Sequence, residues 1–356
     1  MSARGTDPAS DRLVAWYEEH RRALPWRETR DAYRIWISEV ILQQTRVAQG
    51  LDYYLRFTTR FPDVRALAAA SEDEVLKLWQ GLGYYSRARS LHAAAREIVA
   101  RFGGVFPERY ADVRSLPGIG EYTAAAVCSI AYGQPYAVVD GNVYRVLSRR
   151  FDLDTPADSA PGRKMFTELA SSLLDTARPG LYNQAVMELG ALQCVPRSPD
   201  CAVCPLSDGC LARARGTVAE RPVKRPRRES VSRYFNYLHI GCGDRTLIVR
   251  RGGRDIWRGL YEFPLVETTE AVDFAALQRT ERWRELFGDF SGFRLCRTET
   301  MPPHVLSHRV IRAVFHRLEA DVLPACDPSL VSVSETELDT YAVSRLTQAY
   351  LERLAR

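Results

Sequence analysis

The chain has 356 residues, which is enough for two domains that each bury a hydrophobic core. Its hydrophobic content of 46% and charged content of 26% are ordinary for a globular protein. No apolar run reaches the roughly 18 residues that a membrane span needs, and the polar N-terminal segment lacks the apolar stretch of a secretory signal. The net charge of +5 permits a polyanionic partner without requiring one.

Helical periodicity dominates the chain up to about residue 193, with no alternating β pattern of any length. We expect an all-α domain whose short helices are joined by short loops. The expected helices cover 11–24, 32–50, 53–61, 64–70, 71–80, 91–102, 107–116, 121–132, 143–150, 164–174 and 182–192. The helix that follows Ser71 begins with a capping box, because Glu74 stands three residues later.

A tight turn, LPGIG at 116–120, separates two of these helices. Gly118 and Gly120 permit positive φ and close backbone approach, and the following helix is small and apolar. The turn therefore places free backbone N–H groups at a helix N-terminus, which is an anion site. Taken alone, the same turn is equally well a plain connection between helices.

Two carboxylates have contrasting sequence surroundings. Asp140 ends a hydrophobic run and stands where the N-cap of the next helix belongs. Glu39 lies among apolar residues of the 32–50 helix, so its pKa should rise if that face is buried. Each has an ordinary alternative: Asp140 as a simple cap, and Glu39 as a residue on the wet flank of an amphipathic helix.

Four of the eight cysteines fall within 17 positions: Cys194, Cys201, Cys204 and Cys210. Four thiols in one compact loop indicate a metal centre. Zinc sites usually show two separated CxxC pairs, whereas this loop has one, so the spacing favours an iron–sulfur cluster over zinc.

A basic stretch, 216–233, contains six Lys or Arg residues and two prolines without apolar periodicity, and it reads as a linker. From residue 234 the pattern changes to strands, expected at 234–242, 246–251, 293–300 and 310–318, with a turn and strand at 259–264. Helical patterns cover 274–286 and 344–354. We therefore expect domains at 8–215 (helical) and 234–356 (α+β), joined by the basic linker.

Several segments together resemble the adenine DNA glycosylases of the MutY type, within the wider group of helix-hairpin-helix glycosylases that includes endonuclease III. They are LPWR at 24–27, WISEVILQQT at 36–45, GLGYYSRAR at 81–89, LPGIGEYTAAA at 116–126, VDGNVYRVLSR at 139–149 and the four-cysteine loop. The resemblance covers nearly the whole chain. It implies a helix-hairpin-helix catalytic domain followed by a NUDIX-like domain.

The resemblance implies a two-carboxylate mechanism for removing adenine. Glu39 and Asp140 would face each other across a cleft, with the adenine nucleotide flipped out of the duplex between them. Glu39 would protonate adenine at N7, and Asp140 would stabilise the oxocarbenium-like sugar. Tyr122 and Asn142 would position the nucleophile or Asp140. Because Tyr122 stands where relatives with lyase activity carry a lysine, the resemblance implies a monofunctional glycosylase.

The resemblance also assigns the DNA contacts. Gln44 would enter the base stack with Tyr84 beside it, and Trp26, Arg27 and Gln184 would form the adenine pocket. The resemblance assigns a second set of residues to phosphate and metal: the hairpin at Gly118 and Gly120 would hold a DNA phosphate, and Cys194, Cys201, Cys204 and Cys210 would ligate a [4Fe-4S] cluster.

In this family the NUDIX-like domain reads 8-oxoguanine, and Leu306-Ser307-His308 matches the recognition loop. Many relatives have Phe in place of Leu306, and the acidic NUDIX hydrolase box is missing, so we expect no pyrophosphatase activity. The implied partner is double-stranded DNA with A:8-oxoguanine or A:G mispairs, bound by a monomer without a membrane. We expect it in the cytoplasm of a bacterium, or in the nucleus or mitochondria of a eukaryote.

Three alternatives remain open from the sequence. The first is an endonuclease III-like glycosylase/lyase, against which Tyr122 and the second domain argue. The second is a non-catalytic iron–sulfur DNA-binding protein, in which Glu39 would be dispensable. The third is a nucleotide hydrolase, which the missing hydrolase box disfavours.

Overall fold

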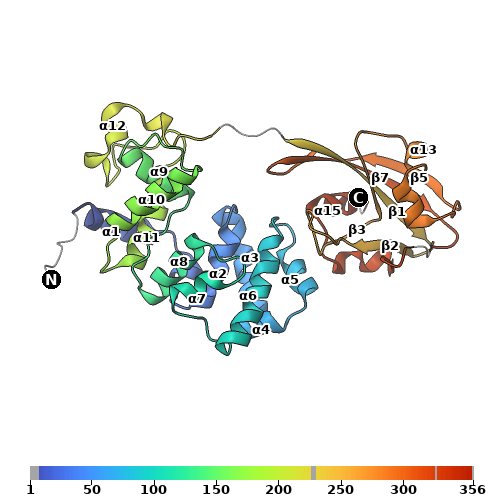
Figure 1. The fold of residues 1–356 in the computed structure, drawn as a ribbon, viewed down its shortest axis with the longest axis horizontal. Coiled ribbons are helices and arrows are strands. Elements are labelled where there is room, and N and C mark those ends of the chain that lie inside the picture. The colour runs from blue at the N-terminus through green and yellow to red at the C-terminus, as the bar shows by residue number, and fades with distance from the viewer. Residues whose placement is uncertain (1–7, 226–229, 325–326, 355–356) are drawn as a thin grey trace. The chain divides into compact units, whose positions relative to one another are not determined.

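The computed structural model describes residues 8–225, 230–324 and 327–354, and these form two compact units (Figure 1). The helical unit comprises residues 8–69 and 90–225, and the mixed unit comprises residues 70–89, 230–324 and 327–354. Residues 226–229 of the predicted linker lie outside the described residues, so the boundaries of the three predicted segments stay predictions.

The helical unit is all-α in its described part, which confirms the predicted class. Its helices are α1 (Pro8–His20), α2 (Ala32–Leu42), α3 (Val47–Arg60), α4 (Val64–Ala69), α7 (Tyr110–Ser115), α8 (Glu121–Tyr132), α9 (Gly141–Arg150), α10 (Ala160–Leu173), α11 (Pro179–Glu188) and α12 (Leu211–Arg215), together with α6 (Ser86–Phe102) from residue 90 onward. Among the described residues of the whole chain, no helix has both the length and the apolar character to cross a bilayer.

The single helix expected over 32–50 is wrong, because the chain breaks between α2 and α3. Gln44 adopts a φ of 57°, a left-handed conformation that a helix cannot contain. The apolar pattern nevertheless continues past the break, since both helices pack on each other. Gly50 permits this contact: a Cβ there would lie 2.8 Å from the Leu42 side chain.

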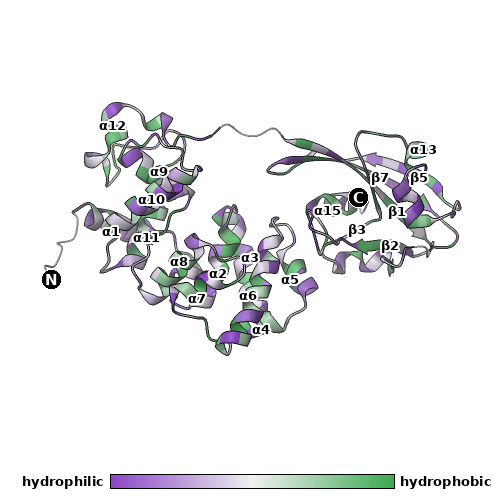
Figure 2. Cartoon of the chain, viewed as in Figure 1, coloured by the Kyte–Doolittle hydropathy of each residue, from purple (hydrophilic) through white to green (hydrophobic). Residues whose placement is uncertain are grey.

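Helix α8 is the central buried helix of the unit, as its small apolar residues predict. Ala124, Ala126 and Val127 are fully buried, and α2 and α11 both pack against this helix. Small side chains let neighbouring helix axes approach closely, so carboxylates on adjacent elements can reach a common space. Figure 2 shows purple and green segments alternating along most helices, as amphipathic packing requires.

The mixed unit is built on a mixed eight-stranded sheet in which β3, β2, β1, β7 and β5 lie in that order. Its strands are β1 (Val231–Cys242), β2 (Arg245–Arg250), β3 (Tyr261–Glu262), β4 (Leu265–Thr268), β5 (Arg294–Thr300), β6 (His304–Val305), β7 (Arg309–Glu319) and β8 (Leu330–Ser334). The central strands β1 and β7 are parallel, whereas the other strand pairs are antiparallel.

Strand β1 is buried on both faces because it is central. Phe235 and Tyr237 pack on one face with residues of α15 (Arg345–Leu354), and Leu238 and Ile240 pack on the other with residues of α14 (Glu281–Phe287). Alternate side chains of a strand point to opposite faces, so this sheet has a separate core on each side.

Several element bounds differ from the sequence expectation. The helix expected over 274–286 is two helices, α13 (Phe274–Leu277) and α14, because Thr280 caps the second by accepting a hydrogen bond from the Trp283 N–H at 3.2 Å. Strand β1 begins at Val231, inside the range expected to be linker, and β8 was not expected. Helix α5 (Glu72–Trp79), in the mixed unit, begins as predicted with the Ser71 hydroxyl accepting from the Glu74 N–H.

Candidate active site

One cavity of about 1100 Å³ in the helical unit gathers most of the predicted site residues. Its wall includes residues of α2, α8, α9 and α11. Ten of the predicted residues line it: Trp26, Arg27, Glu39, Gln44, Gly118, Gly120, Tyr122, Asp140, Asn142 and Gln184. Residues from five separate stretches of sequence thus share one space.

Glu39 lies near the end of α2 and is 8% exposed, so the wet-flank interpretation is wrong. Burial, opposed by a hydrogen bond from Tyr122 and by the charge of Arg27 and supported by the nearby Asp140 charge, raises the pKa of its carboxyl to about 7. The Tyr122 hydroxyl donates to Glu39 Oε2 at 2.5 Å. At neutral pH this carboxyl therefore has a large protonated fraction, which suits a proton donor.

Asp140 is the N-cap of α9, as predicted. Its Oδ1 accepts from the backbone N–H groups of Asn142 and Val143 at 2.9 and 2.7 Å, and its Oδ2 accepts from the Asn142 side chain at 2.9 Å. Burial raises the pKa of Asp140 above its ordinary value, and these hydrogen bonds and Arg145 oppose the rise. The sequence indicated only the helix terminus, because burial of this side chain depends on tertiary packing.

Glu188 is a functional candidate that the sequence analysis missed. It is fully buried at the end of α11 and lines the same cavity. Arg27 donates to both of its oxygens at 2.7 and 2.6 Å, and the Arg22 guanidinium donates at 2.9 and 2.5 Å. Its only signal in the sequence is an isolated acid in an apolar helix.

The predicted pocket residues occupy different environments. Trp26 is 7% exposed and packs edge-on against Tyr54, with ring centroids 5.0 Å apart. The Gln184 side chain accepts a hydrogen bond from the Tyr17 hydroxyl at 3.1 Å. Gln44 lies in the break after α2, and its left-handed backbone is strain of the kind found at functional sites.

The hairpin turn between α7 and α8 has the geometry that its glycines permit. Gly118 has a φ of 74°, and a Cβ there would lie 2.4 Å from Ser90 Cβ, so no other residue fits without a shift. Gly120 is the N-cap of α8, and no side chain of the described residues caps this helix start. The first N–H groups of α8 therefore border the cavity without a cap from a side chain.

The four clustered cysteines line a second, small cavity of about 30 Å³. In the described parts of the chain, no group of three or more His, Cys, Asp or Glu side chains is spaced for a single metal ion. Four thiols around a cavity are the donor set of an iron–sulfur cluster. Cys194, Cys201, Cys204 and Cys210 would hold it, and the cluster would cross-link four points of this loop.

Arginines of α9 connect this loop to the first cavity. Arg145 donates to the Cys194 carbonyl at 2.7 Å and to the Asn142 side-chain oxygen at 2.8 Å. Arg149 is 3% exposed and donates to the Val195 carbonyl at 2.7 Å. One helix thus carries Asp140 at its start and holds the cysteine loop with its arginines.

Three predicted site residues belong to the mixed unit. Tyr84 is half exposed with a φ of 46°, and its hydroxyl lies 2.7 Å from Ser307 Oγ. Ser307 and His308 are exposed, whereas Leu306 packs against the core cluster that contains Phe235. These residues are therefore not part of the cavity in the helical unit.

Three family models match the chain. Residues 37–170 match the HhH-GPD superfamily of base excision DNA repair proteins, 194–210 match the iron–sulfur binding domain of endonuclease III, and 236–353 match the NUDIX domain. The second match confirms the [4Fe-4S] cluster as the cofactor, and the other two confirm the predicted fold class.

Known relatives and solved structures agree with these models. The adenine DNA glycosylase of Mus musculus is 36% identical over 88% of this chain and 71% of its own, and that of Homo sapiens is 37% identical over 76% of this chain. The chain spans 60% of the length of the human relative.

Among solved structures, a thermostable thymine-DNA glycosylase is 30% identical with a TM-score of 0.54, and the match covers 58% of this chain and 95% of the glycosylase chain. An endonuclease III in a non-covalent DNA complex, 21% identical with a TM-score of 0.50 over 58% of this chain and 94% of its own, shares the fold. The chain therefore belongs to the adenine DNA glycosylase family.

Proposed function

We propose that this protein is a monofunctional adenine DNA glycosylase that removes adenine mispaired with 8-oxoguanine or guanine in base excision repair. The observation that carries the proposal is the single cavity that holds Glu39, Tyr122 and Asp140, with the pKa of Glu39 raised to about 7. The relatives named adenine DNA glycosylases support adenine as the base.

Glu39 acts as the general acid. Adenine is a poor leaving group as an anion, so it must receive a proton, most readily at N7, before the bond between C1′ and N9 breaks. A buried carboxyl with a pKa near 7 keeps its proton at neutral pH and still releases it to a base. Tyr122 fixes the orientation of this carboxyl through its hydrogen bond.

Asp140 stabilises the positive sugar that remains after adenine leaves. Two backbone N–H groups and the Asn142 side chain favour its carboxylate form, although burial opposes ionisation. A carboxylate already fixed in place by hydrogen bonds stabilises a developing cation more strongly than one that water must reorient around. This division between a proton donor and an anion is the one that glycoside hydrolases use.

The cavity offers no amine for a lyase step. The described residues that line it include Arg22, Arg27, Arg46 and Arg145 but no lysine. Without a Schiff base, the abasic site stays uncut. Trapping with borohydride tests this point: a high yield of covalent enzyme–DNA adduct would contradict the monofunctional assignment.

Recognition of the opposite base belongs to the proposal as well. The recognition loop, defined as Leu306–His308, presents Ser307 and His308 to solvent. Ser307 can distinguish 8-oxoguanine from guanine through hydrogen bonds at N7 and O8, where the two bases differ in donor and acceptor pattern. We propose that the protein does this as a monomer.

The test is adenine release from four duplexes that place adenine opposite 8-oxoguanine, guanine, cytosine or thymine. Glu39→Gln and Asp140→Asn should abolish most of the release from the first two. The double variant Ser307→Ala with His308→Ala should lose the preference for 8-oxoguanine and still cleave A:G. Equal losses on both duplexes would contradict the assigned role of the loop.

A further inference from the structure

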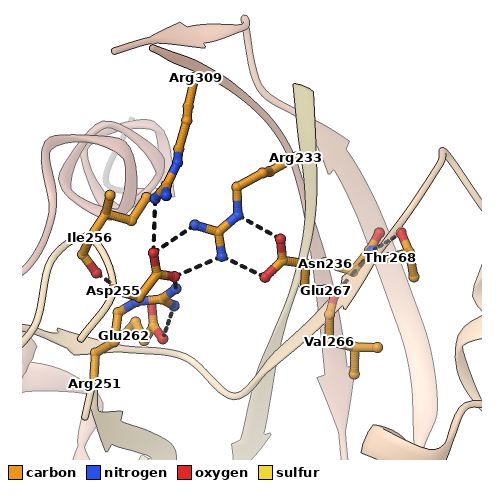
Figure 3. A network of polar contacts seen from close by, with 10 residues as sticks. All are labelled: Arg233, Asn236, Arg251, Asp255, Ile256, Glu262, Val266, Glu267, Thr268 and Arg309. Atoms are coloured by element: carbon orange, nitrogen blue, oxygen red, sulfur yellow. Dashed lines mark hydrogen bonds and ion pairs between the residues drawn. The ribbon is translucent and has the colours of Figure 1, made fainter. Parts of the chain in front are cut away.

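One carboxylate, Asp255, is the centre of an ion network in the mixed unit (Figure 3). Its Oδ1 accepts from Arg233 Nη1 at 2.8 Å and from Arg309 Nη1 at 3.0 Å. Its Oδ2 accepts from Arg233 Nη2 and from Arg251 Nη2, both at 2.7 Å. Asp255 thus joins residues of β1 and β7 to the residue that follows β2.

The network is balanced in charge. Arg233 also forms a two-pronged contact with Glu267, with both distances 2.6 Å, and Arg251 donates to Glu262 at 2.7 Å. Although burial alone would raise it, these arginines hold the pKa of Asp255 well below its usual range. The three arginines face three carboxylates, so no surplus positive charge is left for DNA phosphates. We therefore interpret the network as stabilising the fold and not as a ligand site.

Arg309 connects this network to the recognition loop. The loop is the tip of the hairpin formed by β6 and β7, and Arg309 is the first residue of β7. The Leu306 N–H donates to the Arg309 carbonyl at 2.8 Å, and the Val231 N–H donates to the His308 carbonyl at 3.2 Å. Both ends of the loop are therefore held by backbone contacts, and Asp255 anchors the side chain that follows it.

A second contact joins the same segment to the hairpin. Trp257, two residues after Asp255, packs edge-on against His304 of β6, with ring centroids 5.7 Å apart. Its backbone has a φ of 59°, an uncommon conformation for a bulky residue, which surrounding contacts must stabilise. The 255–257 segment therefore contacts both strands of the hairpin.

We propose that Asp255 is a positioning residue that sets specificity for the opposite base by fixing the recognition loop. This inference rests on the proposed function of that loop. Strand β6 has only two residues, and so short a hairpin has little stability of its own. A fixed loop loses less conformational entropy when Ser307 and His308 contact a base. It also holds both side chains in the geometry that 8-oxoguanine requires, so the preference for 8-oxoguanine over guanine increases.

The test compares Asp255→Asn with Glu267→Gln as a matched control. Both substitutions remove one carboxylate that pairs with Arg233, but of the two only Asp255 also contacts Arg309 and Arg251. Cleavage under single-turnover conditions is measured on A:8-oxoguanine and A:G duplexes, together with the melting temperature. Asp255→Asn should reduce the preference for 8-oxoguanine at least about tenfold, because the amide nitrogen cannot accept the two hydrogen bonds at its position and the negative charge that holds Arg309 is lost. Glu267→Gln should keep the preference, and neither variant should alter the A:G rate.

Arg309→Gln is the second variant, because its half-exposed side chain can be replaced without a buried defect. It should lose the same preference, and its combination with Asp255→Asn should add no further loss. Lower melting temperatures with an unchanged preference in both variants would overturn the inference. A wild-type protein without any preference for 8-oxoguanine would instead contradict the proposed role of the loop.

Discussion

Two glutamates that line the same cavity show how differently the fold treats buried carboxyls. Glu39, on the α2 wall, is 8% exposed and has a pKa raised to about 7. Glu188, on the α11 wall, is fully buried, yet hydrogen bonds from Arg27 and Arg22 outweigh burial and lower its pKa to about 2. Burial alone therefore does not decide the protonation state of a carboxyl here, because charged partners can outweigh it.

The two glutamates are therefore expected to have different roles, Glu39 in proton transfer and Glu188 in stabilising the wall of the cavity. Glu39 has one neutral hydrogen-bond donor, Tyr122, so its proton can be transferred. Glu188 forms ion pairs with Arg27 and Arg22 and has a lowered pKa, so we expect it to stay ionised and to hold Arg27 in place. Changing each residue in turn tests the contrast.

The largest effect is expected for Glu39→Gln. Loss of a general acid should lower the single-turnover rate of adenine release about a thousandfold. The control is Glu168→Gln, because Glu168 is an exposed residue of α10 with only a loose ion pair at 3.9 Å. A Glu39→Gln protein that keeps the wild-type rate would contradict the acid role.

Glu188→Gln should reduce stability by about 3 kcal/mol, because Arg27 and Arg22 would lose the carboxylate that compensates them. Since the folded pKa of Glu188 is depressed, its contribution is present above about pH 4.5 and is lost as the pH falls toward about 2. Urea denaturation across this range measures both effects. At neutral pH Glu39→Gln should show no such loss, and equal destabilisation by the two variants would remove the distinction between them.

Asp140→Asn should lower the rate about a hundredfold, because a neutral amide cannot stabilise the cationic sugar. An asparagine still caps α9, so the melting temperature should stay near that of the wild type. Single-turnover kinetics and thermal denaturation on the same preparation separate the two effects. A parallel fall in stability and rate would point to a structural role for Asp140.

The smallest effect concerns pH. The wild-type rate should fall as the pH rises above about 7, because Glu39 then loses its proton. The hydrogen bond from Tyr122 lowers the pKa of Glu39, so Tyr122→Phe should move this limb upward by roughly half a unit to one unit. A pH–rate profile of both proteins measures the shift, and a downward shift would contradict the assigned contact.

Local patterns predicted most elements and the chemistry-bearing motifs. The N-cap at Asp140, the turn at Gly118 and Gly120 and the four-cysteine loop all depend on neighbours within a few residues, which the sequence shows directly. The break at Gln44 could not be predicted in this way, because the apolar pattern of two packed helices looks the same as that of one.

Local patterns could not predict contacts between residues that are distant in sequence. Glu188 meets Arg27 across 161 positions, and Arg309 meets Asp255 across 54. The sequence by itself determined which residues can carry a proton, a charge or a metal ligand. Only the tertiary structure decided their protonation states and roles, because a pKa depends on the burial and charged neighbours that folding brings together.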